Sequence, residues 1–330
     1  IGVYQIFHAS INLVTYVLYR KNKIRPRFRL LLDGLVLVFL GGTSLLSSTG
    51  NSVFQLFVLG AYFFLYGVSN IRDGFLFEEE IGKNHLKRRI RISLPIVLAA
   101  LIPARTLAKI NKFMQENADE REDIHLGMVK SGKTAELEIF VHTAETSLFS
   151  AIGHVDICYQ GRVISYGNYD PSSETLFGMV GDGVLYFCDR DKYIDLCKRE
   201  SQKTLFGYGI DLTPEMEKAV QKKLAELKQL TIPWEPSADK IMTGDGKEDY
   251  TYAYKIRHET DGELYKFIKS KFKSYFVLST NCVLLADTIV GQAGTDILSP
   301  KGFIAPGTYQ AYLNREFEKP NSIVVSKHVY

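Results

Sequence analysis

The chain has 330 residues, enough for about two ordinary domains. Lys and Arg number 40 against 37 Asp and Glu, and a net charge of +3 is far below the basic excess of a dedicated nucleic-acid-binding protein. With 46% hydrophobic and 23% charged residues the chain is not disordered, and four cysteines are too few for a disulfide scaffold. The first residue is Ile1 rather than Met, so we expect a short N-terminal segment to be missing.

Residues 1–110 hold most of the long apolar runs and are predicted to form a transmembrane helical region. A helix needs about 20 mostly apolar residues to cross the hydrocarbon core of a bilayer. The stretches 28–48 and 52–69 meet this requirement best, whereas polar residues interrupt 1–19 and two prolines lie within 92–108. For 92–108 an interfacial or soluble helix is the alternative. The sequence therefore predicts an α-helical membrane region of about four spans.

The distribution of basic residues predicts the orientation of these spans. The loop 20–29 carries six basic and no acidic residues, the loop 47–52 carries no charge, and the segment before 92–108 is basic again. Because Lys and Arg concentrate in cytoplasmic loops, four spans would place the rest of the chain outside the cytoplasm. We expect a multi-pass protein of the cell membrane, with the lipid bilayer as a partner and the soluble domain on the extracytoplasmic side.

Residues 111–133 are predicted to be a charged linker, and residues 134–330 a small α+β domain with an antiparallel sheet. Strands are expected where apolar residues alternate with polar ones, and helices where they recur every three or four residues. The predicted strands are 135–142, 154–159, 162–167, 184–188, 204–211 and 322–326. The predicted helices are 213–230, which Thr213 caps, 261–274 and 282–290. Gln160 and Gly161 are expected to form a two-residue hairpin connection.

Residues 127–134 (GMVKSGKT) match the phosphate-binding pattern G-x-x-x-x-G-K-[ST] in every position. A working loop of this kind follows a buried strand and begins a helix whose N-terminus holds the phosphates. Here polar residues precede the motif and a strand-like alternation follows it, so we interpret it as a solvated turn. We expect no cofactor and no metal, because Cys188 and Cys197 lack metal-site spacing. Histidines such as His142 also lack ligand spacing and are expected on the surface.

A cysteine and a histidine form the candidate catalytic pair. Asn281 and Cys282 begin a predicted helix, where unpaired backbone N–H groups and the positive end of the helix dipole favour a thiolate. The same N–H groups can bind an oxyanion, and His154 at the start of a strand can exchange a proton with the thiol. Spacing alone is a weak signal, because a buried cysteine is more often a small apolar residue.

The order of these segments resembles the circularly permuted NlpC-type papain-like superfamily. The resemblance rests on AIGHVDICYQGRVISYGNYD, DLTPEMEKAVQKKL and YFVLSTNCVLLADTIVG, in which a Gly-His strand comes first and an Asn-Cys helix comes last. It covers about half of the chain and excludes the membrane region. It implies a permuted papain-like domain in which Cys282 is the nucleophile and His154 the base.

Members of this superfamily usually have a third polar residue on the strand that follows the histidine. With the hairpin turn at residues 160–161, Asp156 faces Ser165, and facing residues share one side of a sheet. Ser165 is therefore the first candidate for the third catalytic residue. Asp156, on the same face, is an alternative, and so is Asn168 if the strand twists or ends there.

Together these features predict a membrane-anchored cysteine hydrolase that works through a thioacyl intermediate. The resemblance and the outside topology imply peptide or amide bonds of cell-wall peptidoglycan as its substrate. One alternative is a lipid acyl hydrolase or acyltransferase of the lecithin:retinol acyltransferase type. Another is a catalytically inactive binding domain on a membrane scaffold. No nucleic-acid partner is expected.

Overall fold

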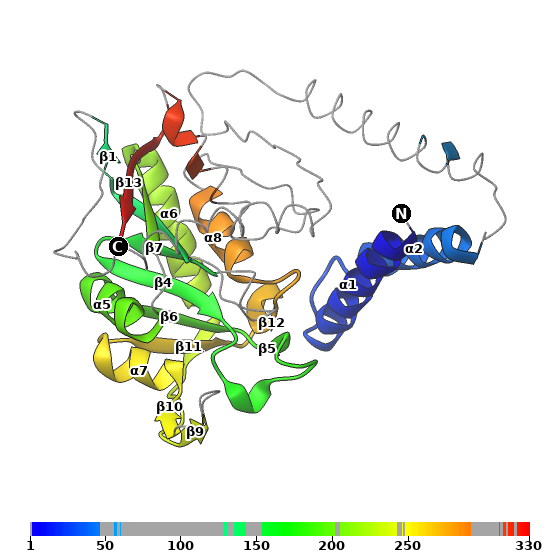
Figure 1. Cartoon of the computed structure of the whole chain (residues 1–330), viewed down its shortest axis with the longest axis horizontal. Helices are drawn as coiled ribbons and strands as arrows, with labels where there is room; N and C mark the ends of the chain where they lie inside the picture. Colours follow the sequence, from blue (N-terminus) through cyan, green and yellow to red (C-terminus); the bar gives the residue numbers. More distant parts are fainter. Residues whose placement is uncertain are drawn as a thin grey trace. The chain divides into compact units, whose positions relative to one another are not determined.

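The computed structural model describes residues 2–46, 56–57, 60, 128–130, 135–142, 154–201, 205–242, 246, 248–291, 310, 313–314, 316–319 and 322–330. The chain divides into two compact units, Ile1–Arg89 and Ile90–Tyr330 (Figure 1). Most of the motif at 127–134 lies outside the described residues, and residues 128–129 of it form an edge strand.

The first unit contains two helices that pack against each other, α1 (Gly2–Lys21) and α2 (Phe28–Leu46). Two glycines of α2 lie where the helices approach closely. A Cβ atom on Gly34 would lie 2.9 Å from Leu13, and one on Gly41 would lie 2.8 Å from Ile6. Small residues that let two backbones approach in this way are typical of helix pairs in membranes.

Within the described part of the chain, α2 alone is long and apolar enough to cross a membrane, and 11% of its apolar stretch is buried. The stretch 1–19 forms the expected helix but does not meet this criterion, because polar residues interrupt it. Among the described residues the prediction of about four spans is therefore corrected to one candidate span, and nothing in them supports the multi-pass topology. The stretches 52–69 and 92–108 lie outside the described residues, apart from residues 56, 57 and 60.

The second unit has the predicted α+β architecture with a large antiparallel sheet. Its nine strands have the order β1-β13-β7-β2-β3-β4-β6-β11-β8. Their bounds are β1 (Met128–Val129), β2 (Leu137–His142), β3 (His154–Tyr159), β4 (Arg162–Gly167), β6 (Val184–Asp189), β7 (Leu205–Ile210), β8 (Thr231–Pro233), β11 (Glu263–Phe267) and β13 (Val324–Val329). Two small sheets pair β5 (Val180–Asp182) with β12 (Ser274–Phe276), and β9 (Lys240–Met242) with β10 (Glu248–Tyr250).

Helices cover both faces of the large sheet (Figure 1). They are α5 (Arg190–Ser201), α6 (Pro214–Lys228), α7 (Tyr252–Glu259) and α8 (Cys282–Val290), with short 3₁₀ turns η3 (Pro171–Ser173) and η4 (Lys271–Lys273). One apolar cluster joins α6 and α8 to Val155 and Ile157 of β3. The other joins α5 and α7 to Phe140 and Cys158. Because side chains alternate along a strand, β3 contributes to both clusters.

The β3–β4 hairpin forms as predicted. Gln160 and Gly161 have φ values of 51° and 74°, and two positive φ angles are what a tight two-residue hairpin turn requires. Cys158 lies opposite Val163, in the predicted register. The helix predicted from residue 213 also forms, since the Thr213 side chain accepts a hydrogen bond from the Met216 N–H at 3.3 Å.

The prediction of a helix at 261–274 is wrong. This segment instead forms β11, which lies between β6 and β8, and then η4. Leu264 packs with the α5–α7 cluster and Phe267 with the α6–α8 cluster. Pairing with β6 and β8 satisfies the backbone hydrogen-bonding groups on both sides of β11. Its aromatic residues also favour a strand, so these tertiary contacts outweigh the local preference for a helix that the spacing of apolar residues indicated.

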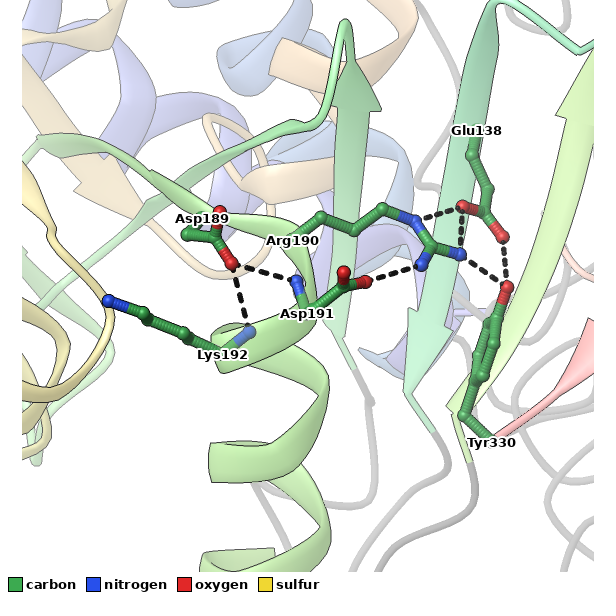
Figure 2. Close-up of polar contacts among 6 residues, drawn as sticks. All are labelled: Glu138, Asp189, Arg190, Asp191, Lys192 and Tyr330. Carbon is green, nitrogen blue, oxygen red and sulfur yellow. Dashed lines mark hydrogen bonds and ion pairs between the residues drawn. The ribbon is translucent and has the colours of Figure 1, made fainter. Parts of the chain in front are cut away.

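A polar network fixes the start of α5 to the sheet (Figure 2). Arg190 donates to Glu138 of β2 from Nε at 3.0 Å and from Nη2 at 2.9 Å, and to the Tyr330 hydroxyl at 2.6 Å. The Asp189 carboxylate accepts two of the first N–H groups of α5, each at 3.1 Å. This anchoring sets the position of Tyr193, one helical turn further on.

Candidate active site

The predicted catalytic residues lie together where β3 begins. His154 is the first residue of β3, and Asp156 follows on the same face. Ser165 is on the neighbouring strand β4, and Cys282 is the first residue of α8, which packs against both strands. Strand ends and helix N-termini are rigid positions for such side chains.

The N-terminus of α8 presents Cys282 with free backbone donors beside it. Asn281 caps the helix: its Oδ1 accepts the Leu284 N–H at 3.1 Å, and its Nδ2 donates to the Val277 carbonyl at 3.0 Å. The N–H groups of Cys282 and Val283 belong to the first helical turn and have no acceptor within the helix. The Cys282 side chain is buried, and it lies close enough to His154 and Tyr275 for its charge and hydrogen bonding to raise the pKa of each.

Three oxygen atoms surround one nitrogen of the His154 ring. Its Nε2 lies 2.8 Å from Asp156 Oδ1 in an ion pair, 2.9 Å from Ser165 Oγ and 3.0 Å from the Tyr169 hydroxyl. Burial lowers the pKa of His154, but the charges of Asp156 and Cys282 and hydrogen bonds to both raise it well above its usual value.

Asp156 is a buried carboxylate between two histidines. Its Oδ2 lies 2.7 Å from His142 Nε2 and accepts a hydrogen bond from the Tyr193 hydroxyl at 2.5 Å. Burial opposes ionisation of Asp156. The charge of His154 and hydrogen bonds from both histidines nevertheless hold its pKa well below the usual range. The carboxylate is therefore ionised and stabilises the cationic form of His154.

Two of the three candidates for the third residue reach the histidine. Ser165 lies on the His154 side of the sheet, as the hairpin register predicts, and its Oγ also lies 2.8 Å from the Tyr169 hydroxyl. Asp156 is the charged partner of the ring. Asn168 turns elsewhere: its Nδ2 donates to the Gly178 carbonyl at 3.5 Å.

The sequence analysis missed several residues of this site. His142 was expected on the surface, but it is buried and lies directly opposite His154 in the β2–β3 pair. His142 is the last residue of the predicted strand 135–142. Pairing this strand with the next predicted strand, 154–159, is what places His142 opposite His154. Tyr193, Tyr169 and Tyr275 gave no local signal, because they reach the site from α5, from the segment after β4 and from β12.

The part of the chain that the structure describes contains no group of three or more His, Cys, Asp or Glu side chains arranged to hold a metal. None of the four cysteines forms a disulfide, and all four are buried. Burial raises the pKa of the Cys158 thiol to about 12, and it also raises the pKa of Cys188. Cys282 differs from these thiols because a histidine and a helix N-terminus adjoin it.

The arrangement has the parts of a nucleophilic site. It combines a thiol, a histidine that can accept and return a proton, a carboxylate that orients the histidine, and backbone donors for a developing oxyanion. Comparison of the chain with protein-family models, curated proteins and solved structures finds no match.

Proposed function

We propose that the protein is a membrane-anchored cysteine hydrolase that cleaves a carbonyl substrate through a thioacyl intermediate. The observation that carries this proposal is the contact between Cys282 and His154 at the N-terminus of α8. A helix N-terminus and a neighbouring histidine are the surroundings in which reactive cysteines are found. The apolar helix α2 supports the anchoring to a membrane.

In the first half of the proposed reaction, the Cys282 thiolate attacks the carbonyl carbon and a carbon–sulfur bond forms. The N–H groups of Cys282 and Val283 stabilise the oxyanion. His154 then gives its proton to the leaving nitrogen or oxygen as the scissile bond breaks. In the second half, His154 takes a proton from water, which attacks the thioester, releases a carboxylic acid and regenerates the thiol–histidine pair.

For the substrate we propose the peptide or amide bonds of peptidoglycan, on the basis of the order of the Gly-His and Asn-Cys segments. This order is also that of a permuted papain-like domain, which we propose as the finer fold of the second unit. The candidate membrane helix α2 favours a second substrate class, an acyl lipid, because it would hold the chain at a bilayer. Both substrates would form the same thioester on Cys282.

The test uses the full chain in detergent, with isolated peptidoglycan in one reaction and phospholipid vesicles in another. Released amines and fatty acids are quantified, and mass spectrometry locates any adduct on Cys282. The variant Cys282→Ala should abolish turnover, whereas Cys197→Ala, a buried thiol of α5, should retain it. A peptidoglycan fragment on Cys282 supports the first substrate, and an acyl chain supports the second. Absence of any adduct and of turnover in the wild type contradicts the hydrolase and favours a binding domain.

A further inference from the structure

We propose that His142 and Tyr193 are positioning residues that hold the Asp156 carboxylate against His154, the partner of Cys282 in the proposed reaction. The inference rests on the proposed function of Cys282 and His154. It extends the site by one layer, to two side chains that contact the Asp156 carboxylate.

The geometry places both residues on the same oxygen of Asp156. His142 Nε2 lies 2.7 Å from Oδ2, and the Tyr193 hydroxyl donates to Oδ2 at 2.5 Å. The Tyr193 hydroxyl and His142 Nε2 are 3.1 Å apart, so the three groups form a closed triangle. With Oδ2 held in this way, Oδ1 is directed at His154, 2.8 Å from Nε2.

The surroundings leave Asp156 little freedom to find another arrangement. Its side chain has no exposed surface, and that of His142 is 10% exposed. Apart from the two histidines, the titratable groups that face Asp156 are phenols and a thiol, and burial raises the pKa of each. They are Tyr193 of α5, Tyr186 and Cys188 of β6, Tyr169 after β4 and Tyr252 of α7. Cys282 of α8 faces His154.

Removal of either group would leave Oδ2 of the buried carboxylate with one hydrogen-bonding partner in place of two. A buried charge that loses a hydrogen bond is less stable, so the carboxylate would rotate or take up a proton. Either change weakens the charge that stabilises the His154 cation. The proton would then return to Cys282, and less thiolate would be present in mildly acidic solution.

The experiment measures the rate at which iodoacetamide alkylates Cys282 in the full chain, at about pH 6 and about pH 9, with the adduct located by mass spectrometry. The ratio of the two rates reports the thiolate that His154 maintains, because an unperturbed thiol with a pKa near 8.5 is mostly protonated at about pH 6. The assay needs no substrate, so it separates this inference from the question of what is hydrolysed.

We expect Tyr193→Phe and His142→Leu each to lower the ratio by up to about tenfold, the change that one pKa unit gives when the thiol pKa lies above the lower pH of the assay. His142→Gln should retain the ratio within a factor of about two, because the glutamine amide places an N–H near the position of Nε2. The matched control is Tyr208→Phe, which removes a buried hydroxyl that donates to Asn314 at 2.9 Å, away from Asp156. It should leave the ratio unchanged.

An unchanged ratio in both Tyr193→Phe and His142→Leu overturns the inference and leaves the proposed function standing. A wild-type ratio equal to that of an unperturbed thiol overturns both. Tryptophan fluorescence checks that each variant is folded, since Trp234 packs on the α5–α7 cluster. If His142→Leu fails to fold, Tyr193→Phe, which keeps the aromatic ring, decides the question by itself.

Discussion

Replacement of Asp156 by Asn should destabilise the second unit, and the loss should depend on pH. The side chain is fully buried, with its two oxygens 2.7 and 2.8 Å from ring nitrogens of two histidines. Unit charges about 4 Å apart attract by about 4 kcal/mol at an effective dielectric constant near 20, and desolvation offsets part of this. Removal of one partner from a buried pair typically costs about 3–5 kcal/mol. We expect a loss of about 3 kcal/mol in the free energy of unfolding.

The sign of the pH dependence follows from two opposite pKa shifts. The folded-state pKa of Asp156 is lowered, so its contribution is present above the unfolded value near 3.9 and is lost as the pH falls. The folded-state pKa of His154 is raised, so its contribution is complete below the unfolded value near 6.5 and is lost as the pH rises. The difference between wild type and Asp156→Asn should therefore be largest between about pH 4 and pH 6.5.

Urea denaturation followed by tryptophan fluorescence measures this difference. Trp234 is the chain's single tryptophan and packs on the α5–α7 cluster, on the Asp156 side of the sheet. The control is Asp191→Asn, whose carboxylate is 86% exposed and pairs with Arg190, and it should change the free energy of unfolding by less than about 1 kcal/mol. A loss that is constant from about pH 4 to pH 9, or that grows above pH 6.5, would refute the reasoning.

Two further substitutions test how α8 is held. Asn281→Ala removes the acceptor of the Leu284 N–H and should cost about 1 kcal/mol in urea denaturation; no change in stability would mean that the cap is dispensable. Leu285→Ala removes a side chain that is 2% exposed in the α6–α8 cluster and should cost about 2–5 kcal/mol. A loss below about 1 kcal/mol for Leu285→Ala would show that α8 is packed less tightly than the structure indicates.

Features that depend on neighbouring residues could be predicted from the sequence. The turn at Gln160 and Gly161 requires residues that tolerate positive φ, and it fixed the register that brought Ser165 to the His154 side. Thr213 and Asn281 mark helix starts because their side chains accept hydrogen bonds from the first helical turn. Of these signals, Asn281 marks the start of the helix that carries Cys282.

Features that depend on contacts between distant segments could not be predicted in the same way. The segment 263–267 has helical spacing, yet its place between β6 and β8 makes it a strand. Tyr193 reaches the site from a helix whose charged sequence gives no sign of its buried face. The place of His142 at the site can be recognised only when β2 is paired with β3, because this pairing puts it opposite His154.

The convergence of two groups on one oxygen of Asp156 is itself evidence for its charge. A neutral carboxylic acid carries its own proton on one oxygen, and that oxygen would donate to a neighbour rather than only accept from it. An ionised carboxylate only accepts, and the Tyr193 hydroxyl that donates to Oδ2, together with the ion pair between Oδ1 and His154, fits that form. The thiolate of Cys282, the cation of His154 and the carboxylate of Asp156 would together carry one negative charge. Among the described partners of Asp156 only the two histidines can carry a positive charge. The charge of His154, the contact with His142 and the hydrogen bond from the Tyr193 hydroxyl therefore stabilise the carboxylate together.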